Sequence, residues 1–152
     1  MTINSFSIYQ VNWADSYARL AYIRRTVFIE EQKVPEDLEW DGKDEQAIHL
    51  LAVDTHNQAI GCVRMLQGGH IGRMAVLNTW RNKGVGSRLL NQVIMLAKQM
   101  QLSELTLSAQ SHAIQFYEHA GFKTYGEEYF DAAILHQEMK LSISLPCHNL
   151  TD

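Results

Sequence analysis

A basic, glycine-rich segment at residues 81–88 is the part of this sequence best suited to bind an anion. The segment reads Arg81-Asn82-Lys83-Gly84-Val85-Gly86-Ser87-Arg88 and leads into a run of apolar residues at helical spacing. The start of a helix presents unpaired backbone N–H groups and the positive end of the helix dipole. Glycines let an anion approach that backbone closely, and three basic side chains add positive charge. The segment therefore predicts a phosphate-binding loop.

Two common phosphate-binding motifs do not fit this segment. A Walker A loop requires Lys and then Ser or Thr after its last glycine, whereas Gly86 is followed by Ser87 and Arg88. The dinucleotide-binding fingerprint requires a third glycine at the position of Leu89. A nucleotide-binding domain of either kind is therefore disfavoured.

Charged residues are unevenly distributed along the chain. Residues 55–103 contain six basic residues and no acidic one, whereas residues 30–45 contain eight acidic residues and two lysines. Two solvated faces would explain this pattern. A basic site for an anionic cofactor beside an acidic site for a cationic substrate would explain it equally. The charge pattern alone leaves both interpretations open.

Length and composition limit the class of protein. The chain has 152 residues, a formal net charge of −4, 46% hydrophobic and 20% charged residues, which predicts one globular domain over 1–145 and a polar tail at 146–152. The mild acidity argues against a nucleic-acid-binding protein. The N-terminal region lacks an apolar stretch typical of a signal peptide or membrane span, and Cys62 and Cys147 form no C-x-x-C pair. We therefore expect a cytoplasmic protein with free thiols, no membrane association and no metal site.

The hydrophobic pattern predicts the elements that must position these residues. Strands are expected at 6–11, 48–53, 60–66, 71–77, 104–109 and 134–141, and helices at 15–31, 85–100 and from 111 to just before Gly121. Asp15 is the expected N-cap of the first helix. The resulting order is a mixed α/β (α+β) layout, and it places the phosphate-binding loop between a strand and a long amphipathic helix.

Two motifs in this order resemble a known family. Arg81-Asn82-Lys83-Gly84-Val85-Gly86 resembles the pyrophosphate-binding Arg/Gln-x-x-Gly-x-Gly/Ala signature of the GNAT N-acetyltransferases. About 30 residues later, Ala113-Ile114-Gln115-Phe116-Tyr117-Glu118-His119-Ala120-Gly121-Phe122 resembles the family's Ala-x-x-Phe-Tyr-x-x-x-Gly-Phe segment. A further resemblance is to the ElaA-like branch of the family. It rests on the stretch Val27–Gln32, the acidic loop that follows it within residues 30–45, His49 and Ile134-x-His136-x-x-Met139.

The resemblance implies a fold and a reaction. The fold would be that of acyl-CoA N-acyltransferases, with a mixed, mostly antiparallel sheet of about six or seven strands flanked by about four helices. The reaction would be direct acetyl transfer from acetyl-CoA to a primary amine of a small-molecule or peptide acceptor. A non-catalytic acyl-CoA-binding regulatory module is the alternative, and a homodimer is common in the family.

The resemblance also assigns roles to individual residues. Backbone N–H groups of Met74, Ala75 and Val76 would stabilise the oxyanion, and the residues that would hold the CoA phosphates are Arg81, Asn82, Lys83, Gly84, Val85, Gly86 and Ser87. Gln110 would contact the pantetheine arm. Tyr117 would lie beside the cofactor and act as the general acid that protonates the leaving thiolate.

The general base stays open at the level of sequence. The candidates are Glu31, Glu45, His49, His112 and His136, and a chain of water molecules is a further possibility. Glu31 is favoured, either as a base or as a contact to the acceptor, because the first helix and its loop usually line the acceptor side in the family. His49 is kept as a second candidate.

Overall fold

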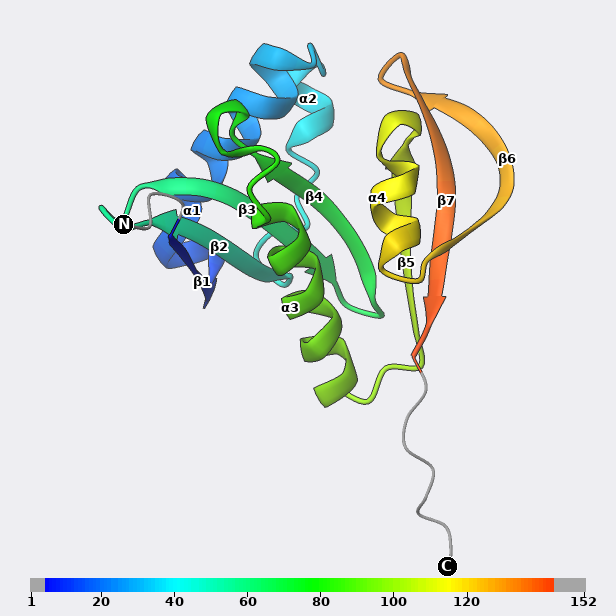
Figure 1. Ribbon diagram of the computed structural model, residues 1–152. Coiled ribbons are helices and arrows are strands. Elements are labelled where there is room, and N and C mark those ends of the chain that lie inside the picture. The colour runs from blue at the N-terminus through cyan, green and yellow to red at the C-terminus, as the bar shows by residue number, and fades with distance from the viewer. Residues whose placement is uncertain (1–4, 144–152) are drawn as a thin grey trace, which may run out of the picture.

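The computed structural model describes residues 5–143, so the polar tail predicted at 146–152 and Cys147 lie outside the described residues. A seven-stranded sheet runs through this part of the chain in the order β1-β2-β3-β4-β5-β7-β6 (Figure 1). The strands are β1 (Phe6–Val11), β2 (Ile48–Asp54), β3 (Ala59–Leu66), β4 (His70–Val76), β5 (Glu104–Gln110), β6 (Lys123–Asp131) and β7 (Ile134–Ser142). The predicted mixed, mostly antiparallel sheet is thereby confirmed.

Strands β4 and β5 form the one parallel pair among the described strands, and they stay together only briefly. Their register pairs His70 with Thr106 and Ile71 with Leu107, and no later residues of the two strands pair with each other. All other neighbouring strands are antiparallel. The sheet therefore divides after Ile71 into two halves that separate toward the ends of β4 and β5.

Helices cover both faces of the sheet (Figure 1). They are α1 (Trp13–Arg24), η1 (Arg25–Glu31, a π-helix), α2 (Glu36–Glu39), η2 (Asn78–Trp80), α3 (Val85–Gln99), η3 (Ser111–Ala113) and α4 (Ile114–His119). The alternation of β2 explains this two-sided cover: Leu50 belongs to the core cluster with α3, and Leu51 to the cluster with α1.

The first helix begins earlier than predicted, with Asn12 and not Asp15 as its N-cap, and its helical turns end at Glu31, as predicted. It begins at Trp13 because Asn12 is the N-cap, and the Asn12 side-chain oxygen accepts a hydrogen bond from the Asp15 backbone N–H at 2.8 Å. From Arg25 the helix continues as the π-helix η1. Strand β6 has no counterpart in the prediction because its residues are almost all exposed, so it lacks an alternating apolar pattern.

A buried network of charged side chains fastens α1 and α2 to the sheet. It contains three arginines and three acids: Arg24, Arg64, Arg73, Glu39, Asp41 and Asp44. Arg24 is 1% exposed, binds Glu39 at 2.8 Å and Asp44 at 2.7 Å, and lies between the rings of Trp13 and Trp40. The equal number of charges of each sign is what allows this cluster to be buried.

The network shifts the pKa values of its acids in different directions. Burial would raise the pKa of Asp44, but hydrogen bonds from Arg24 and Arg64 and their charges outweigh it and lower the pKa. At Glu39 burial prevails over the nearby arginines and raises the pKa. The arginines of the network therefore hold Asp44 ionised inside the protein.

We expect Arg24→Ala to lower the free energy of unfolding by about 3–5 kcal/mol, because it takes one of two arginine partners from each of the buried acids Glu39 and Asp44 and leaves an excess of buried negative charge. Urea denaturation followed by circular dichroism measures this loss. The matched control is Arg25→Ala, which removes an exposed pair with Glu36 and should leave the unfolding midpoint nearly unchanged. Equal effects of the two substitutions would contradict a special role of the buried network.

Candidate functional site

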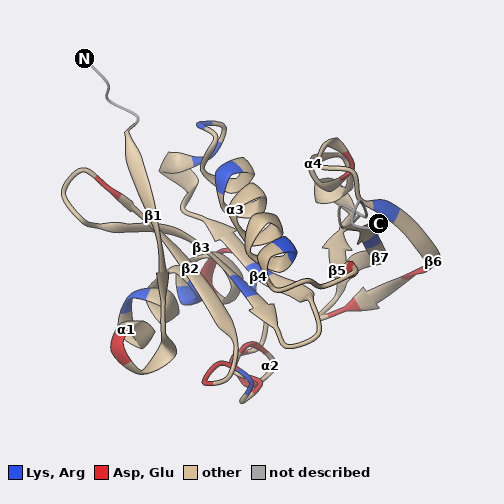
Figure 2. Cartoon of the chain, turned by 90° about the horizontal axis from the view of Figure 1, so that it is seen from below, with Lys and Arg blue, Asp and Glu red and all other residues tan. Residues whose placement is uncertain are grey.

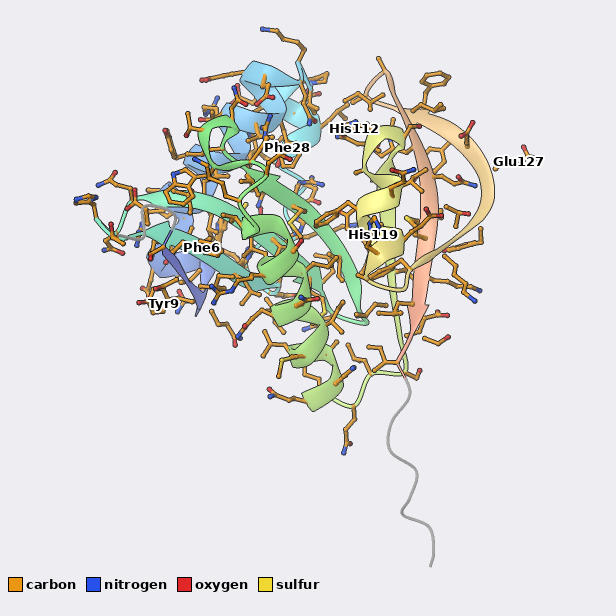
Figure 3. All side chains as sticks on the ribbon, in the orientation of Figure 1. Phe6, Tyr9, Phe28, His112, His119 and Glu127 are labelled. Carbon is orange, nitrogen blue, oxygen red and sulfur yellow. The ribbon has the colours of Figure 1, made fainter. Side chains whose placement is uncertain are left out.

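A cavity of about 710 Å³ lies where β4 and β5 separate. Its lining comes from η1, β4, β5, α4 and the β6–β7 hairpin, so it joins the two halves of the sheet. Phe28 of η1 and His112 of η3 belong to its walls and can be followed in Figure 3. The cavity therefore depends on the division of the sheet.

The loop before α3 has the geometry of an anion site. Gly84 is the N-cap of α3 with φ +86°, a left-handed conformation that glycine adopts without strain, and no side chain caps the helix. The first backbone N–H groups of this 15-residue helix therefore have no side-chain partner. Lys83 lies over the ring of Trp80, and Arg88 lies over the ring of Phe6, so positive charge is held close by.

Arg81 links this loop to the far side of the cavity. Its guanidinium forms a bidentate ion pair with Glu31 at 2.6 and 2.8 Å, and its Nε donates to the carbonyl of Val76 at 2.9 Å. The hydrogen bonds from Arg81 lower the pKa of Glu31. A carboxylate held in this way is a weak proton acceptor, so Glu31 is better suited to hold Arg81 than to act as a base.

The edge of β4 that faces the cavity carries Met74, Ala75 and Val76. The register with β3 shifts between Cys62 and Arg64, and Arg73 on β4 has φ +51°. An irregularity of this kind bends a strand locally and increases its twist. Because pairing with β5 has ended by this point, backbone groups on this edge of β4 are left without a partner from the neighbouring strand.

Tyr117 enters the cavity from α4. Its side chain is 8% exposed and lies between Phe116 and Phe122, with ring centroids 5.0 and 6.0 Å away. Burial raises the pKa of Tyr117 to about 12. The phenol therefore keeps its proton at neutral pH and can donate it to an atom in the cavity.

Gln110 lies at the end of β5 and also lines the cavity. Its side chain exchanges two hydrogen bonds with Gln32, at 2.8 and 3.4 Å, and so connects β5 with the residue that follows η1. Together with the Glu31–Arg81 pair, this contact fixes the end of η1 across the cavity.

His49 does not take part in the site. It is 1% exposed, its Nε2–H donates to the carbonyl of Asp44 at 2.8 Å, and its ring lies against Trp13. Burial lowers the pKa of His49. It is thus a structural residue beneath the charged network, and Glu45 likewise lies outside the cavity lining.

Five of the eight acids in the segment 30–45 form ion pairs, so the segment is not simply a surface of unpaired negative charge. Figure 2 shows its acidic residues gathered around α2, next to basic residues of the neighbouring elements. Asp41 and Asp44 pair with Arg64, Glu39 with Arg24 and Arg73, and Glu36 with Arg25. Much of the charge separation along the sequence is therefore cancelled by ion pairs in the fold.

Some residues of the cavity region were not among the candidates named from the sequence. His70 and Ser108 line the cavity, and Ser108 forms a hydrogen-bonded chain with Tyr129 and Glu138. His136, one of the predicted base candidates, lines the cavity beside them. The alternation of polar residues along β5 and β7 was the available signal, but it does not say which face of the sheet holds the cavity.

Two kinds of site are absent from residues 5–143. No group of three or more His, Cys, Asp or Glu side chains there is arranged to hold a metal ion. None of the helices in the same range combines the length and the apolar character that crossing a membrane requires.

Comparison with known proteins gives consistent matches over most of the chain. The acetyltransferase (GNAT) domain family matches residues 14–143. An uncharacterized N-acetyltransferase of Bacillus subtilis, YjcF, is 33% identical over 121 residues, which cover 78% of this chain and 86% of that protein. An acyl-CoA N-acyltransferase from Pseudomonas aeruginosa has a solved structure with a TM-score of 0.81 and 29% identity, covering 90% of this chain and 99% of that one. ElaA of Escherichia coli has a similar fold, with a TM-score of 0.81, 23% identity and the same coverage.

The buried position of His49 leads to a prediction about stability. His49→Gln removes a ring packed on Trp13 and disturbs the hydrogen bond to Asp44, so the free energy of unfolding should fall by about 1–3 kcal/mol. Urea denaturation measures the change. His56→Gln, at an exposed position in the β2–β3 turn, is the matched control and should have almost no effect. A stability unchanged in His49→Gln would rule out the structural role.

Proposed function

Because the chain belongs to the GNAT acetyltransferase family, we propose that it transfers an acetyl group from acetyl-CoA directly to a primary amine of a small-molecule or peptide acceptor. One observation carries this proposal: a single cavity brings together Arg81, the free edge of β4 and the buried phenol of Tyr117. Arg81 can bind a phosphate, the edge of β4 can stabilise an oxyanion, and Tyr117 can protonate a leaving thiolate.

The CoA phosphates are proposed to bind at the start of α3. The N–H groups of Val85, Gly86 and Ser87 belong to the uncapped first turn, and the helix dipole favours negative charge there. The side chains of Arg81, Asn82 and Lys83 border the same turn. Arg81 would exchange one of its bonds to Glu31 for a phosphate, so Glu31 would hold the guanidinium ready before the cofactor binds.

The thioester is proposed to lie against β4 at the division of the sheet. Main-chain groups of Met74, Ala75 and Val76 lie on an edge that β5 has left, so an N–H from this edge can stabilise the developing oxyanion. The edge of β5 near Gln110 can lie alongside the pantetheine arm. The Gln110 side chain is already hydrogen-bonded to Gln32.

The leaving thiolate is proposed to take its proton from Tyr117. The phenol is neutral at working pH and is shielded from bulk water by Phe116 and Phe122, so the proton can be delivered to sulfur in an environment of low polarity. Tyr117 is regenerated by a proton that leaves the tetrahedral intermediate.

A substitution in the loop tests the cofactor site. In Gly86→Asp, a carboxylate at the start of α3 suits the helix dipole and should not prevent folding, but it repels the phosphates. We expect the Kd for acetyl-CoA, measured by calorimetry, to rise roughly 30-fold or more, equivalent to about 2 kcal/mol.

The controls for this experiment separate charge from size. Gly86→Asn has the same shape without the charge and should bind acetyl-CoA more tightly than Gly86→Asp. A Cβ at position 86 would lie 3.4 Å from the Phe116 ring, an ordinary contact, so both variants should fold. If Gly86→Asp binds acetyl-CoA as well as the wild type, the loop is not the phosphate site.

Removing the Tyr117 hydroxyl tests catalysis itself. Tyr117→Phe keeps the ring and its packing, so the Kd for acetyl-CoA should stay within about threefold while kcat for amine acetylation falls ~100-fold. Tyr9→Phe, at an exposed position on β1, is the control. Tight binding of acetyl-CoA by the wild type without CoA release on a panel of amines would favour a non-catalytic acyl-CoA-binding module instead.

A further inference from the structure

A row of polar side chains crosses the half of the sheet formed by β5, β7 and β6. Side chains on a strand alternate between faces, and Leu105 and Leu107 belong to the core cluster that contains α3. Ser108 and Gln110 therefore project to the opposite face, where Gln110 meets Gln32. The register pairs Ser108 with Glu138 and Gln110 with His136, so these polar residues are neighbours.

Three members of this row form a directed chain of hydrogen bonds. The Tyr129 hydroxyl donates its proton to the Glu138 carboxylate. Because that hydroxyl has no second proton, the hydrogen bond between Ser108 and Tyr129 must be donated by Ser108. The Ser108 oxygen, which lines the cavity, is thereby left with its lone pairs to accept from a bound N–H group.

The orientation of His136 is fixed in a way that suits a proton acceptor. Its Nδ1 lies 2.7 Å from the carbonyl of Ile134, and a carbonyl can only accept, so Nδ1 carries a proton. Its ring is stacked on Tyr129 with centroids 5.9 Å apart. In neutral His136 the lone pair is therefore on Nε2, the nitrogen that remains for the cavity.

The charges around this part of the cavity favour a cation. The two basic side chains that line the cavity, Arg73 and Arg81, are paired with Glu39 and Glu31. Asp131 lines the cavity and Glu138 lies behind Ser108, and neither of these two acids has an ion-pair partner within residues 5–143. An alkylammonium group would supply the missing positive charge.

Other candidate bases are less well placed. Glu31 is held by Arg81. His70 is paired with Thr106, at the point where β4 and β5 are still joined. Its Nδ1 forms a hydrogen bond with the Thr106 hydroxyl at 2.9 Å. His112 lines the cavity from an exposed position, and no hydrogen bond within residues 5–143 orients its ring.

We propose that the acceptor binds as a primary alkylammonium between Ser108 and His136, that His136 Nε2 is its proton acceptor, and that Glu138 supplies the counter-charge through Tyr129. This proposal rests on the acetyl transfer proposed above and names its acceptor site. Ser108 and His136 contact the substrate and are binding and catalytic residues, whereas Glu138 and Tyr129 act as positioning residues.

The proposed reaction balances as follows. The ammonium gives one proton to His136 Nε2, and the amine lone pair forms the C–N bond to the thioester carbon. When the C–S bond breaks, sulfur takes the proton of Tyr117, and the remaining excess proton on nitrogen returns to Tyr117. His136 releases its proton to solvent, so the products are an amide, CoA thiol and one proton.

Two substitutions at His136 test the proton acceptor. In His136→Asn the side-chain amide can still donate to the Ile134 carbonyl, so folding should be preserved, whereas His136→Gln keeps a polar group nearer to the position of Nε2. With acetyl-CoA and butylamine, 1,4-diaminobutane or a short lysine peptide, both variants should show kcat reduced ~100-fold. Their Kd for acetyl-CoA should stay within about twofold of wild type. The control is His119→Gln, at an exposed position on α4 outside the cavity lining.

A charge substitution tests the acceptor site separately. Glu138→Gln should raise KM for the alkylamines about tenfold, with kcat and the acetyl-CoA Kd nearly unchanged. A merely structural defect would not raise KM while leaving kcat and the acetyl-CoA Kd unchanged. Glu127→Gln, on the exposed outer part of β6 in Figure 3, is the matched control.

The outcomes separate this inference from the proposed function. If wild type acetylates an amine but His136→Asn keeps kcat within threefold, His136 is not the base and the inference fails alone. An unchanged KM in Glu138→Gln likewise overturns the acceptor site. If wild type acetylates no amine of the panel, the proposed function fails, and the acceptor site fails with it.

Discussion

The early end of the pairing between β4 and β5 is the constraint on which the rest of the site depends. Two parallel strands that remained paired would satisfy each other's backbone groups and close the sheet. Here pairing ends at Ile71 and Leu107, and β4 has an irregular backbone just beyond this point, at Arg73. This separation creates the cavity and the free edge of β4. It also allows side chains from both faces of the sheet to line the same cavity.

A divided sheet needs other contacts to hold its halves in place. On one side, the network around Arg24 fastens α1 and α2 to β3 and β4. Across the cavity, the end of η1 contacts the loop before α3 through Glu31 and Arg81 and contacts β5 through Gln32 and Gln110. Charged and amide groups therefore provide cross-links where the sheet itself provides none.

The two faces of the divided sheet offer different chemistry. On one face, the uncapped start of α3 suits an anionic cofactor, and the buried phenol of Tyr117 keeps its proton at neutral pH. The opposite face of β5 and β7 offers oxygen and nitrogen lone pairs backed by carboxylates. The two chemistries meet at the cavity, because Tyr117, Ser108 and His136 all line it.

What could be predicted from sequence was local. The loop at 81–87 was predictable because a helix start, its glycines and its basic residues lie within one turn, and the strand positions followed from alternation. The same reasoning could not place His49, since a buried histidine and a catalytic one have the same sequence signal. It also could not show that the acids of 30–45 are paired with arginines from α1, β3 and β4.

The sequence by itself determined the mixed architecture, and it identified the glycine-rich loop before α3 and Tyr117 as candidates for an anion site and a general acid, because each depends on residues close together in the chain. Only the tertiary structure decided that Glu31 holds Arg81, that His49 is structural, and that Ser108, Tyr129, His136 and Glu138 adjoin one another. The physical reason is that these contacts arise from strand pairing and ion pairing over long sequence separations. Neither residue type nor spacing specifies such partners before the chain folds.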